Sequence, residues 1–344
     1  MTEVKAKMRN CSIDIFRFVC AIMVVAIHTH PFADVNKELG YIFTQIIPRI
    51  GVPFFFAVAG FFYTQKLEKG QESFLPYIKR LLITYFIWSC FYYIIDFAQG
   101  GYLNLKEFVI SCVYQFVITG SHYHFWFFPA LIFAVCLTTL MFKVKYNKVI
   151  VPLSIILYIV GCLGSSYYEL GIHVPILGKL FMISQFSLIR RILLMGFPFF
   201  TCGYLVYKIK DKIFGAISNK SLLIIWIAVT IIWLAEIGMV IALRWQNNII
   251  ITEGLYLLVV VTLVLLLRNP LPKYKSFSNK SRVLANFTYY SHPFWIACLD
   301  FMGNSILHVT ITETPMFFMT IGLSCIGGLV IYKWDNKLVN FFVN

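Results

Sequence analysis

The sequence is short of charged residues, and acidic residues are the scarcest of them. Of its 344 residues only 13% are Asp, Glu, Lys or Arg, whereas 60% are hydrophobic and 18% are aromatic. The mean hydropathy is +0.79. Soluble globular domains carry roughly a quarter charged residues, so this composition excludes that class and indicates a polytopic membrane protein.

Paired cysteine motifs and long hydrophilic segments are also missing. The nine cysteines are scattered singly, without a C-x-x-C pair, which argues against a metal centre or a disulfide framework. No hydrophilic stretch is long enough for a soluble domain, so we expect residues 1–344 to form one transmembrane domain. The basic start and apolar run resemble a signal peptide. However, Asp14 and Arg17 interrupt that run and no small-residue cleavage site follows, which favours a retained first span.

Apolar runs of membrane-spanning length recur along the whole chain. They lie at roughly 12–30, 41–64, 80–98, 124–142, 148–166, 191–208, 221–243, 250–267, 286–307 and 316–333. The run 108–119 is too short to cross, so an interfacial or re-entrant helix is expected there. The stretch 167–190 is semi-apolar and is expected to pack over the bundle as an outer lid. The predicted fold class is therefore all-α, a transmembrane helix bundle of about ten spans.

The net charge of +14 reflects membrane topology rather than an affinity for nucleic acid. With ten spans, six clusters of cations fall on one side, so the positive-inside rule places both termini in the cytoplasm. The clusters are Lys5, Lys7 and Arg9; Lys66, Lys69, Lys79 and Arg80; Lys143, Lys145 and Lys148; Lys208, Lys210 and Lys212; Arg268, Lys273, Lys275, Lys280 and Arg282; Lys333 and Lys337.

The first run, SIDIFRFVCAIMVVAIHT, carries two functional candidates, Arg17 and His28. On a helix they lie within about 20° of the same face and about 16 Å apart along the axis. Asp14, three residues before Arg17, can pair with the guanidinium. An ionisable residue inside a span indicates function, although Arg17 as a snorkelling interfacial residue and His28 as a mark of the outer helix end are the alternatives.

Further polar groups lie at or near membrane depth in other runs. Arg49 follows Pro48; His124 and Trp126 open the fourth run, where an aromatic belt also explains Trp126; and His292 lies in YYSHPFW. Glu236 lies midway along the seventh run and is expected either to pair with an Arg or to be protonated. Imidazole suits general-base chemistry near neutral pH, so His28 and His124 are candidates to activate a hydroxyl or amine acceptor.

Two interpretations concern cations and histidines on the outer side. Arg190 and Arg191 violate the charge rule there, so they face an anionic ligand or the Glu169 loop, or they act as interfacial anchors. A metal site built from His28, His30, His122 and His124 is disfavoured, because the histidines come from distant loops without a carboxylate pattern. No metal is therefore predicted.

The motifs resemble those of the acyltransferase 3 integral-membrane family. That family has an Arg, ten residues and then a His in its first helix, as IDIFRFVCAIMVVAIH has with Arg17 and His28. GVPFFFAVAGFF, YIKRLLITY, HFWFFPALI, FFTCGYLVY and YYSHPFWI are similar to further family motifs in the same order. Two departures are Ala59, where many members have Ser, and LLITY after Lys79 and Arg80, which lacks a further Arg. Both departures weaken the expectation of efficient acetyl-CoA use.

Within the family, IDIFR, VPFFF and HFWFFPALI are most similar to the membrane portion of vancomycin-resistance membrane-bound serine racemases. Those proteins continue into a cytoplasmic pyridoxal-phosphate domain. No such domain is expected after Lys337, and no pyridoxal phosphate in this chain. The resemblance implies a multi-pass protein of the bacterial plasma membrane, with a fused or associated cytoplasmic racemase domain as partner. The sequence leaves both a monomer and a homodimer open.

The resemblance also implies an activity, the transfer of an acyl group, usually acetyl, from cytoplasmic acyl-CoA to an outer acceptor. Arg17 would bind or orient the donor, His28 would act as base or acyl acceptor with His124 as a further candidate, and Lys79 and Arg80 would meet the phosphates of CoA. Asp14, Arg49, Trp126, Glu236 and His292 are the candidate substrate-binding residues.

Two other functions compete with acyl transfer. One is a carrier that brings L-serine inward, with Arg17 or Arg49 on the carboxylate and Glu236 coupling a proton. The other is a structural anchor, which the buried Arg, Glu and His disfavour.

Overall fold

The structure, a computed structural model, describes residues 10–70, 74–99, 104–246 and 251–334, and within these ranges it has helices, turns and loops but no strand. Helix accounts for 84% of it, which confirms the all-α prediction. Six helices are long and apolar enough to cross a membrane. A seventh span is formed if the pair Glu253–Arg268 and Pro272–Leu307, bent by 87°, counts as one.

Every one of the ten predicted runs contains a helix, but not every helix has the length of a span. The helices Phe127–Lys143 and Asn147–Leu163 are apolar yet shorter than 18 residues. The count of ten and the cytoplasmic side of both termini therefore stay predictions. The cations of residues 1–9 and Lys337 lie outside the described residues.

The chain divides into two compact units. The first comprises Met1–Phe55, Lys212–Ile231 and Val261–Asn344, and the second comprises Phe56–Asp211 and Ile232–Val260. Four helices belong in part to each unit: α3 (Gly51–Leu67), α11 (Phe197–Ala216), α12 (Asn219–Ala242) and α13 (Glu253–Arg268).

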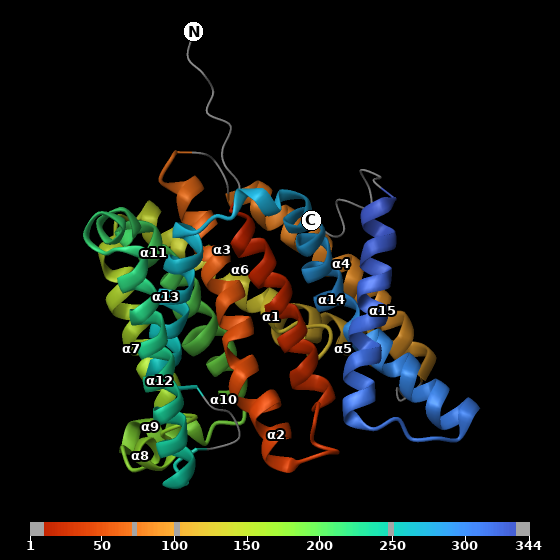
Figure 1. Cartoon of the computed structure of the whole chain (residues 1–344). Coiled ribbons are helices and arrows are strands. Elements are labelled where there is room, and N and C mark those ends of the chain that lie inside the picture. The colour runs from red at the N-terminus through yellow and green to blue at the C-terminus, as the bar shows by residue number, and fades with distance from the viewer. Residues whose placement is uncertain (1–9, 71–73, 100–103, 247–250, 335–344) are drawn as a thin grey trace. The chain divides into compact units, whose positions relative to one another are not determined.

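In the first unit, α1 packs along α14 and α14 packs along α15 (Figure 1). The other elements that lie wholly within the first unit are short helical segments. The elements are α1 (Cys11–Thr29), α2 (Lys37–Tyr41), η1 (Ile42–Ile46), η2 (Ile47–Ile50), η6 (Pro272–Tyr274), α14 (Lys275–Phe301), η7 (Met302–Leu307) and α15 (Glu313–Lys333).

The start of α1 is fixed by a polar cap. The Asn10 side-chain oxygen accepts a hydrogen bond from the backbone N–H of Ile13 at 3.1 Å, which satisfies one of the helix's unpaired donors. The Asn10 amide donates to the carbonyl of Leu266 at 2.9 Å, and the Ser12 hydroxyl donates to the same oxygen at 2.9 Å. The C-terminal end of α13 therefore gains partners for its exposed carbonyls from the first turn of α1.

The helix α14 begins at Lys275, well before the predicted run 286–307. The hydropathy pattern misses this first part, since Lys275, Lys280 and Arg282 interrupt it. These residues nevertheless suit a helix that buries one side: Ser278 and Ser281 are buried, whereas Lys275 and Lys280 are exposed. The predicted loop between the eighth and ninth spans is therefore partly helical.

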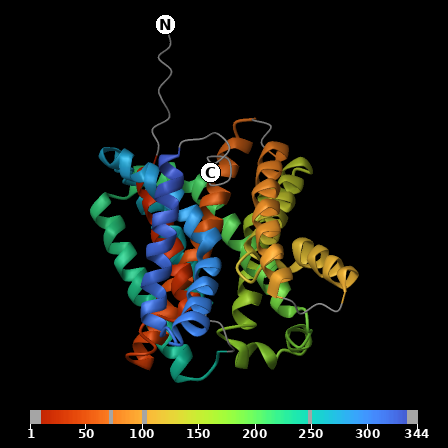
Figure 2. The ribbon, with the colours of Figure 1, turned by 90° about the vertical axis from the view of Figure 1, so that its right-hand side faces the viewer.

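The second unit holds most of the remaining helices, among them α5, which projects to the side in Figure 2 and has no buried residue. This agrees with the expectation that 108–119 is not a crossing helix. The elements are α4 (Phe74–Gln99), α5 (Leu105–Tyr114), η3 (Gln115–Thr119), α6 (Phe127–Lys143), η4 (Asn147–Val149), α7 (Ile150–Leu163), α8 (Tyr168–Ile172), α9 (Pro175–Phe181), α10 (Phe186–Ile189) and η5 (Arg190–Gly196).

The semi-apolar stretch after α7 forms three short helices, α8, α9 and α10. Phe181 and Phe186 are buried there together with Leu194 of η5. The two phenyl rings pack with their centroids 4.9 Å apart. This packing confirms that the stretch covers neighbouring helices of its own unit, and its role as a lid stays a prediction.

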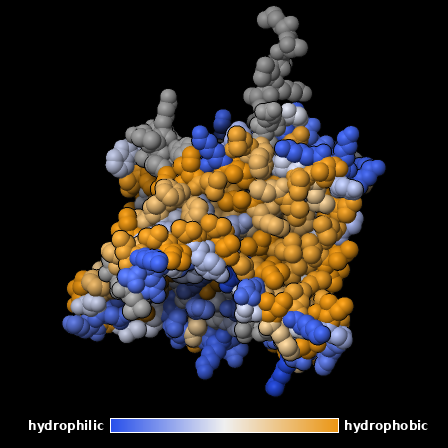
Figure 3. Space-filling model, turned by 180° about the vertical axis from the view of Figure 1, so that it is seen from behind, coloured by the Kyte–Doolittle hydropathy of each residue, from blue (hydrophilic) through white to orange (hydrophobic). Residues whose placement is uncertain are grey.

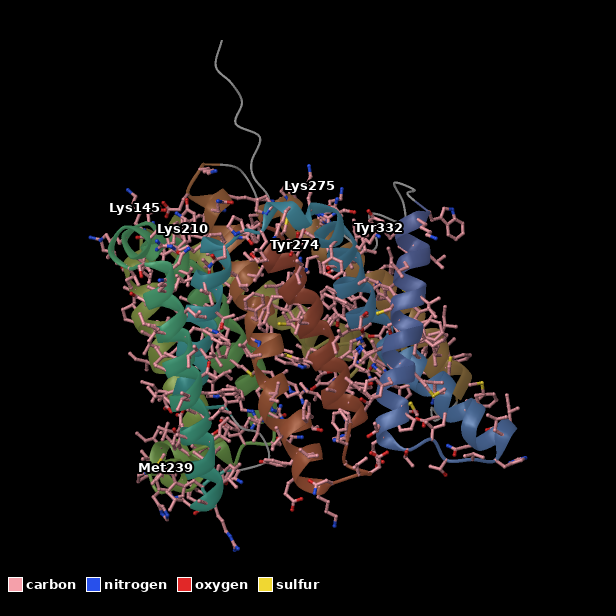
Figure 4. The ribbon with its side chains drawn as sticks, viewed as in Figure 1. Lys145, Lys210, Met239, Tyr274, Lys275 and Tyr332 are labelled. Atoms are coloured by element: carbon pink, nitrogen blue, oxygen red, sulfur yellow. The ribbon has the colours of Figure 1, made fainter. Side chains whose placement is uncertain are left out.

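The surface carries the hydropathy expected of a membrane protein. On the face in Figure 3, hydrophobic side chains form a broad field with hydrophilic ones at the upper and lower borders. Figure 4 shows Lys145 and Lys210 at one end of the second unit and Met239 at the opposite end. Lys145 follows the fourth predicted run and Lys210 follows the sixth, so these two cations share one end of this unit, as the charge pattern predicted.

Within the second unit, α3 and α11 approach each other closely through glycines. A Cβ at Gly60 would collide with the carbonyl oxygen of Phe200, and a Cβ at Gly203 with the carbonyl oxygen of Ala57. Small residues at such positions allow two helix backbones to pack tightly. Gly60 lies in the GVPFFFAVAGFF motif, so this motif supplies the α3 side of the contact.

We expect Gly203→Ala to destabilise the protein by about 1–3 kcal/mol, because the added methyl group meets backbone atoms that do not yield. Gly215→Ala in the same helix is the matched control, because Gly215 is exposed and has nothing within 4 Å of an added Cβ. It should be neutral or stabilising by up to about 1 kcal/mol. Thermal unfolding of the purified chain in detergent measures both, and equal melting temperatures for the two variants would contradict the packing.

Candidate functional site

The two sequence candidates on α1 each meet a residue of α14 in the first unit. The Arg17 guanidinium donates a hydrogen bond from Nη2 to the side-chain oxygen of Asn286 at 2.9 Å. The imidazole rings of His28 and His292 stack, with centroids 5.3 Å apart and an interplanar angle of 21°. Arg17 and His28 are both half-buried. The predicted face of α1 is therefore a packed face with polar partners.

The position of His292 is set by its place before a proline. Pro293 has no N–H, so it cannot make the helix hydrogen bond to the carbonyl of Tyr289. The Nδ1 atom of His292 lies 3.0 Å from that oxygen and 3.1 Å from the carbonyl oxygen of Thr288. Because carbonyl oxygens only accept, Nδ1 carries the hydrogen, and in the neutral ring Nε2 then has the lone pair that a base requires.

Asp14 and Arg49, the other first-unit candidates, have partners near them. The hydroxyl of Ser278 donates to the buried Asp14 carboxylate at 2.9 Å. Arg49 donates from Nε to the carbonyl of Gln45 at 3.2 Å and also bonds the Gln45 side chain. These contacts hold both side chains to the first unit's own helices, and their roles toward a substrate stay predictions.

A second histidine cluster lies in the second unit, in the turn before α6. The Nδ1 atoms of His122 and His124 are 3.1 Å apart, so one ring donates and the other accepts. The ring of Tyr92 from α4 stacks on His122 with centroids 4.4 Å apart. His124 is buried, with 2% of its surface exposed.

The turn that presents this cluster is held by α4 and by one glycine. Gly120 has a φ of 95°, a conformation that favours glycine, and a Cβ there would collide with the backbone of Trp126. The backbone N–H of Ser121 donates to the Tyr85 hydroxyl at 2.9 Å, and the hydroxyls of Ser89 and Ser121 are 2.6 Å apart. These contacts hold the turn that carries the two histidines at the start of α6.

Burial lowers the pKa of His122 from 6.5 to about 4, because the charged imidazolium loses solvent. Between pH 6.5 and about 4, His122 is therefore protonated in the unfolded chain but neutral in the folded chain. The free energy of unfolding is highest above pH 6.5 and decreases as the pH falls toward 4. We expect the melting temperature to fall over this pH range, and the loss of stability behind it to be at most about 3 kcal/mol. In His122→Gln this decrease in melting temperature should be smaller. If the variant shows the same pH dependence as the unmodified chain, His122 is not its cause.

Glu236 lies in the second unit, where its carboxylate receives three donors. The backbone N–H groups of Glu253 and Gly254 donate to it at 3.0 and 2.8 Å, and the hydroxyl of Tyr167 donates as well. A carboxylate at the N-terminus of a helix satisfies unpaired backbone donors and the helix dipole. Glu236 thus has a structural function at the start of α13, and its substrate role stays a prediction.

The remaining candidates lie at the ends of helices of the second unit. Lys79 and Arg80 are exposed in the first turns of α4. Trp126 precedes α6, and the Arg191 guanidinium carbon lies 5.9 Å from the centroid of its ring. Among the described residues, no group of three or more His, Cys, Asp or Glu side chains has the arrangement of a metal site.

Sequence reasoning missed Asn286 and Tyr92, the residues that position Arg17 and His122. Asn286 is a polar residue inside a predicted apolar run, which is the one signal that marks it. Tyr92 carries no signal, because aromatic residues are common throughout the chain. It also named His28 and His292 separately without pairing them, since nothing local links the first helix to the fourteenth.

The fold is that of a polytopic helical membrane protein, and in its first unit Arg17 and His28 of α1 each contact a side chain of α14. The chain belongs to the acyltransferase 3 family, whose model, described as an acyltransferase domain, matches residues 10–333.

Curated relatives come from enterococci. An amino-acid racemase of Enterococcus faecalis is 29% identical over 91% of this chain and 46% of its own length. A serine/alanine racemase of Enterococcus gallinarum is 28% identical over 95% of this chain and 47% of its own length. The chain thus spans about half the length of the curated relatives it matches. No solved structure matches it.

Proposed function

We propose that the chain is a membrane acyltransferase that moves an acyl group, in the first instance acetyl, from cytoplasmic acyl-CoA to an acceptor at the outer side of the bacterial plasma membrane. The observation that carries the proposal is the α1–α14 pairing, with Arg17 on Asn286 and His28 on His292. It supplies a cation and an imidazole on one helix face, each held by a neighbour. The family to which the chain belongs adds support.

The chemistry assigned to these residues is that of acyl transfer. An imidazole, His28 in our assignment, takes the proton of the acceptor hydroxyl or amine, which then attacks the thioester carbonyl. The carbon–sulfur bond breaks, and CoA leaves as the thiol when the imidazolium returns its proton to the sulfur. Arg17 orients the donor through its guanidinium. Lys79 and Arg80 are exposed and belong to the second unit, and their role toward the CoA phosphates stays a prediction.

The names of the relatives favour a second candidate. Proteins called amino-acid racemase and serine/alanine racemase share this membrane portion. We infer from them that the chain is the membrane module of a serine racemase of the vancomycin-resistance type, joined to a cytoplasmic racemase domain. In that setting an L-serine carrier is the alternative to an acyltransferase.

Ligand-dependent thermal stabilisation separates the two functions. A ligand that binds the folded chain but not the unfolded chain stabilises the folded state and so raises the melting temperature. At a ligand concentration about one hundred times its dissociation constant, the stabilisation is about 2.7 kcal/mol. We expect acetyl-CoA to stabilise the purified chain and L-serine to leave it unchanged, with CoA and D-serine as matched ligands. Stabilisation by L-serine without any by acetyl-CoA would transfer the proposal to the carrier.

A further inference from the structure

Two adjacent guanidinium groups of the second unit have no counter-ion within the described residues. Arg190 and Arg191 open η5, and neither lies within salt-bridge distance of a carboxylate in the described part of the chain. Arg190 is buried, with 9% of its surface exposed, and Arg191 is half-buried. Glu169, the acidic residue that the sequence offered as a partner, is exposed and makes no ion pair with them.

The surroundings of the two arginines are aromatic rather than acidic. The guanidinium carbon of Arg190 lies 5.9 Å from the ring centroid of Phe186, and that of Arg191 lies 5.9 Å from the ring centroid of Trp126. Cation–π contacts attract a cation but do not neutralise it. Two like charges on neighbouring residues also repel each other, so the free chain holds this pair at a cost that an anion removes.

A snorkelling anchor does not account for Arg190. A snorkelling side chain extends its charged end toward water and headgroups, which keeps it accessible. Arg190 instead is covered by its own unit, against Phe186 in the packed cluster with Phe181 and Leu194. A buried cation without a carboxylate in a membrane protein is a functional hypothesis by default.

We propose that Arg190 and Arg191 form a binding site for the phosphate group of an anionic membrane lipid, whose headgroup has no cation of its own to neutralise that phosphate. Guanidinium groups present paired donors that match the oxygens of a phosphate. The cations lie at the start of a candidate membrane span, Phe186–Ala216. A lipid phosphate already lies at the membrane surface, whereas a free phosphate ion must shed its water to enter a largely buried site. The site does not depend on acyl transfer.

The proposal is tested with the full chain in a neutral detergent. Phosphatidylglycerol, phosphatidylcholine with the same acyl chains, or inorganic phosphate is titrated while the melting temperature is recorded. We expect phosphatidylglycerol to stabilise the protein and the other two to have little effect. R190Q/R191Q should bind phosphatidylglycerol at least about tenfold more weakly. Its melting temperature without lipid should be higher than that of the unmodified chain, because an uncompensated charge pair is gone.

Two further variants make the test specific. K179Q removes an exposed cation of α9 and should leave the lipid response intact. R190K/R191K keeps both charges without the paired donors and should respond less than the unmodified chain, which keeps the test valid if R190Q/R191Q does not fold. Equal stabilisation of the unmodified chain by phosphatidylcholine, or an unchanged response in R190Q/R191Q, would overturn the site. Equal stabilisation by inorganic phosphate would overturn the lipid as its source.

Discussion

Replacing His28 by Ala is expected to slow acyl transfer by about 10²–10⁴-fold while the affinity for acetyl-CoA stays nearly unchanged. The imidazole takes a proton in the transition state, so its loss raises the barrier for the chemical step rather than weakening the bound state. The half-buried ring is held by stacking on His292 at 5.3 Å, which keeps it on the α1 face. Steady-state kinetics and equilibrium binding together check this expectation.

His30→Ala is the matched control for this variant. His30 lies two residues further on at the same end of α1, but it is exposed and caps the helix with a φ of 52°. We expect its loss to leave turnover within about threefold of the unmodified chain, because an exposed imidazole in a turn has no fixed position for proton transfer. Equal losses in the two variants would show that the effect does not come from the His28 site.

Replacing Arg17 by Gln is expected to weaken the binding of acetyl-CoA by about 10–100-fold, since a charge-assisted hydrogen bond contributes about 1.5–3 kcal/mol. Asn286→Leu should shift affinity in the same direction by less, because Asn286 positions the guanidinium at 2.9 Å rather than meeting the donor itself. Isothermal titration measures both affinities.

Arg17→Lys distinguishes charge from geometry at this position. A lysine keeps the positive charge but loses the planar fork and the fixed bond to Asn286. We expect an affinity between those of the unmodified chain and Arg17→Gln. Full affinity for acetyl-CoA in Arg17→Gln, in a preparation shown to be folded, would remove Arg17 from donor binding.

The sequence carried the all-α class and the polar face of α1, because both follow from local periodicity and composition. Ten residues between Arg17 and His28 place them on one face of any helix. The partners on that face could not be found in this way, because α1 and α14 lie at opposite ends of the chain. The hydropathy pattern also did not predict the start of α14, because Lys275 and Lys280 lower the hydropathy of a segment that is nevertheless helical.

The turn that carries His122 and His124 was also beyond what the hydropathy pattern could predict. His122 and His124 were expected at the outer start of a span. The structure places them in the turn directly before α6, which Gly120 and the Tyr85 hydroxyl fix and which the apolar pattern does not report; their outer side stays a prediction. His124 belongs to the second unit and His28 to the first. Their joint action on one acceptor therefore stays a prediction.

The most direct test of the account is the binding and turnover of radiolabelled acetyl-CoA by the purified chain in detergent, with Arg17→Gln and His28→Ala measured alongside. We predict saturable binding and slow release of label by the unmodified chain, weak binding by Arg17→Gln, and binding without turnover by His28→Ala. If a folded preparation of the unmodified chain shows no saturable binding, the chain is not an acyl-CoA-dependent transferase, and the α1–α14 face must serve another ligand.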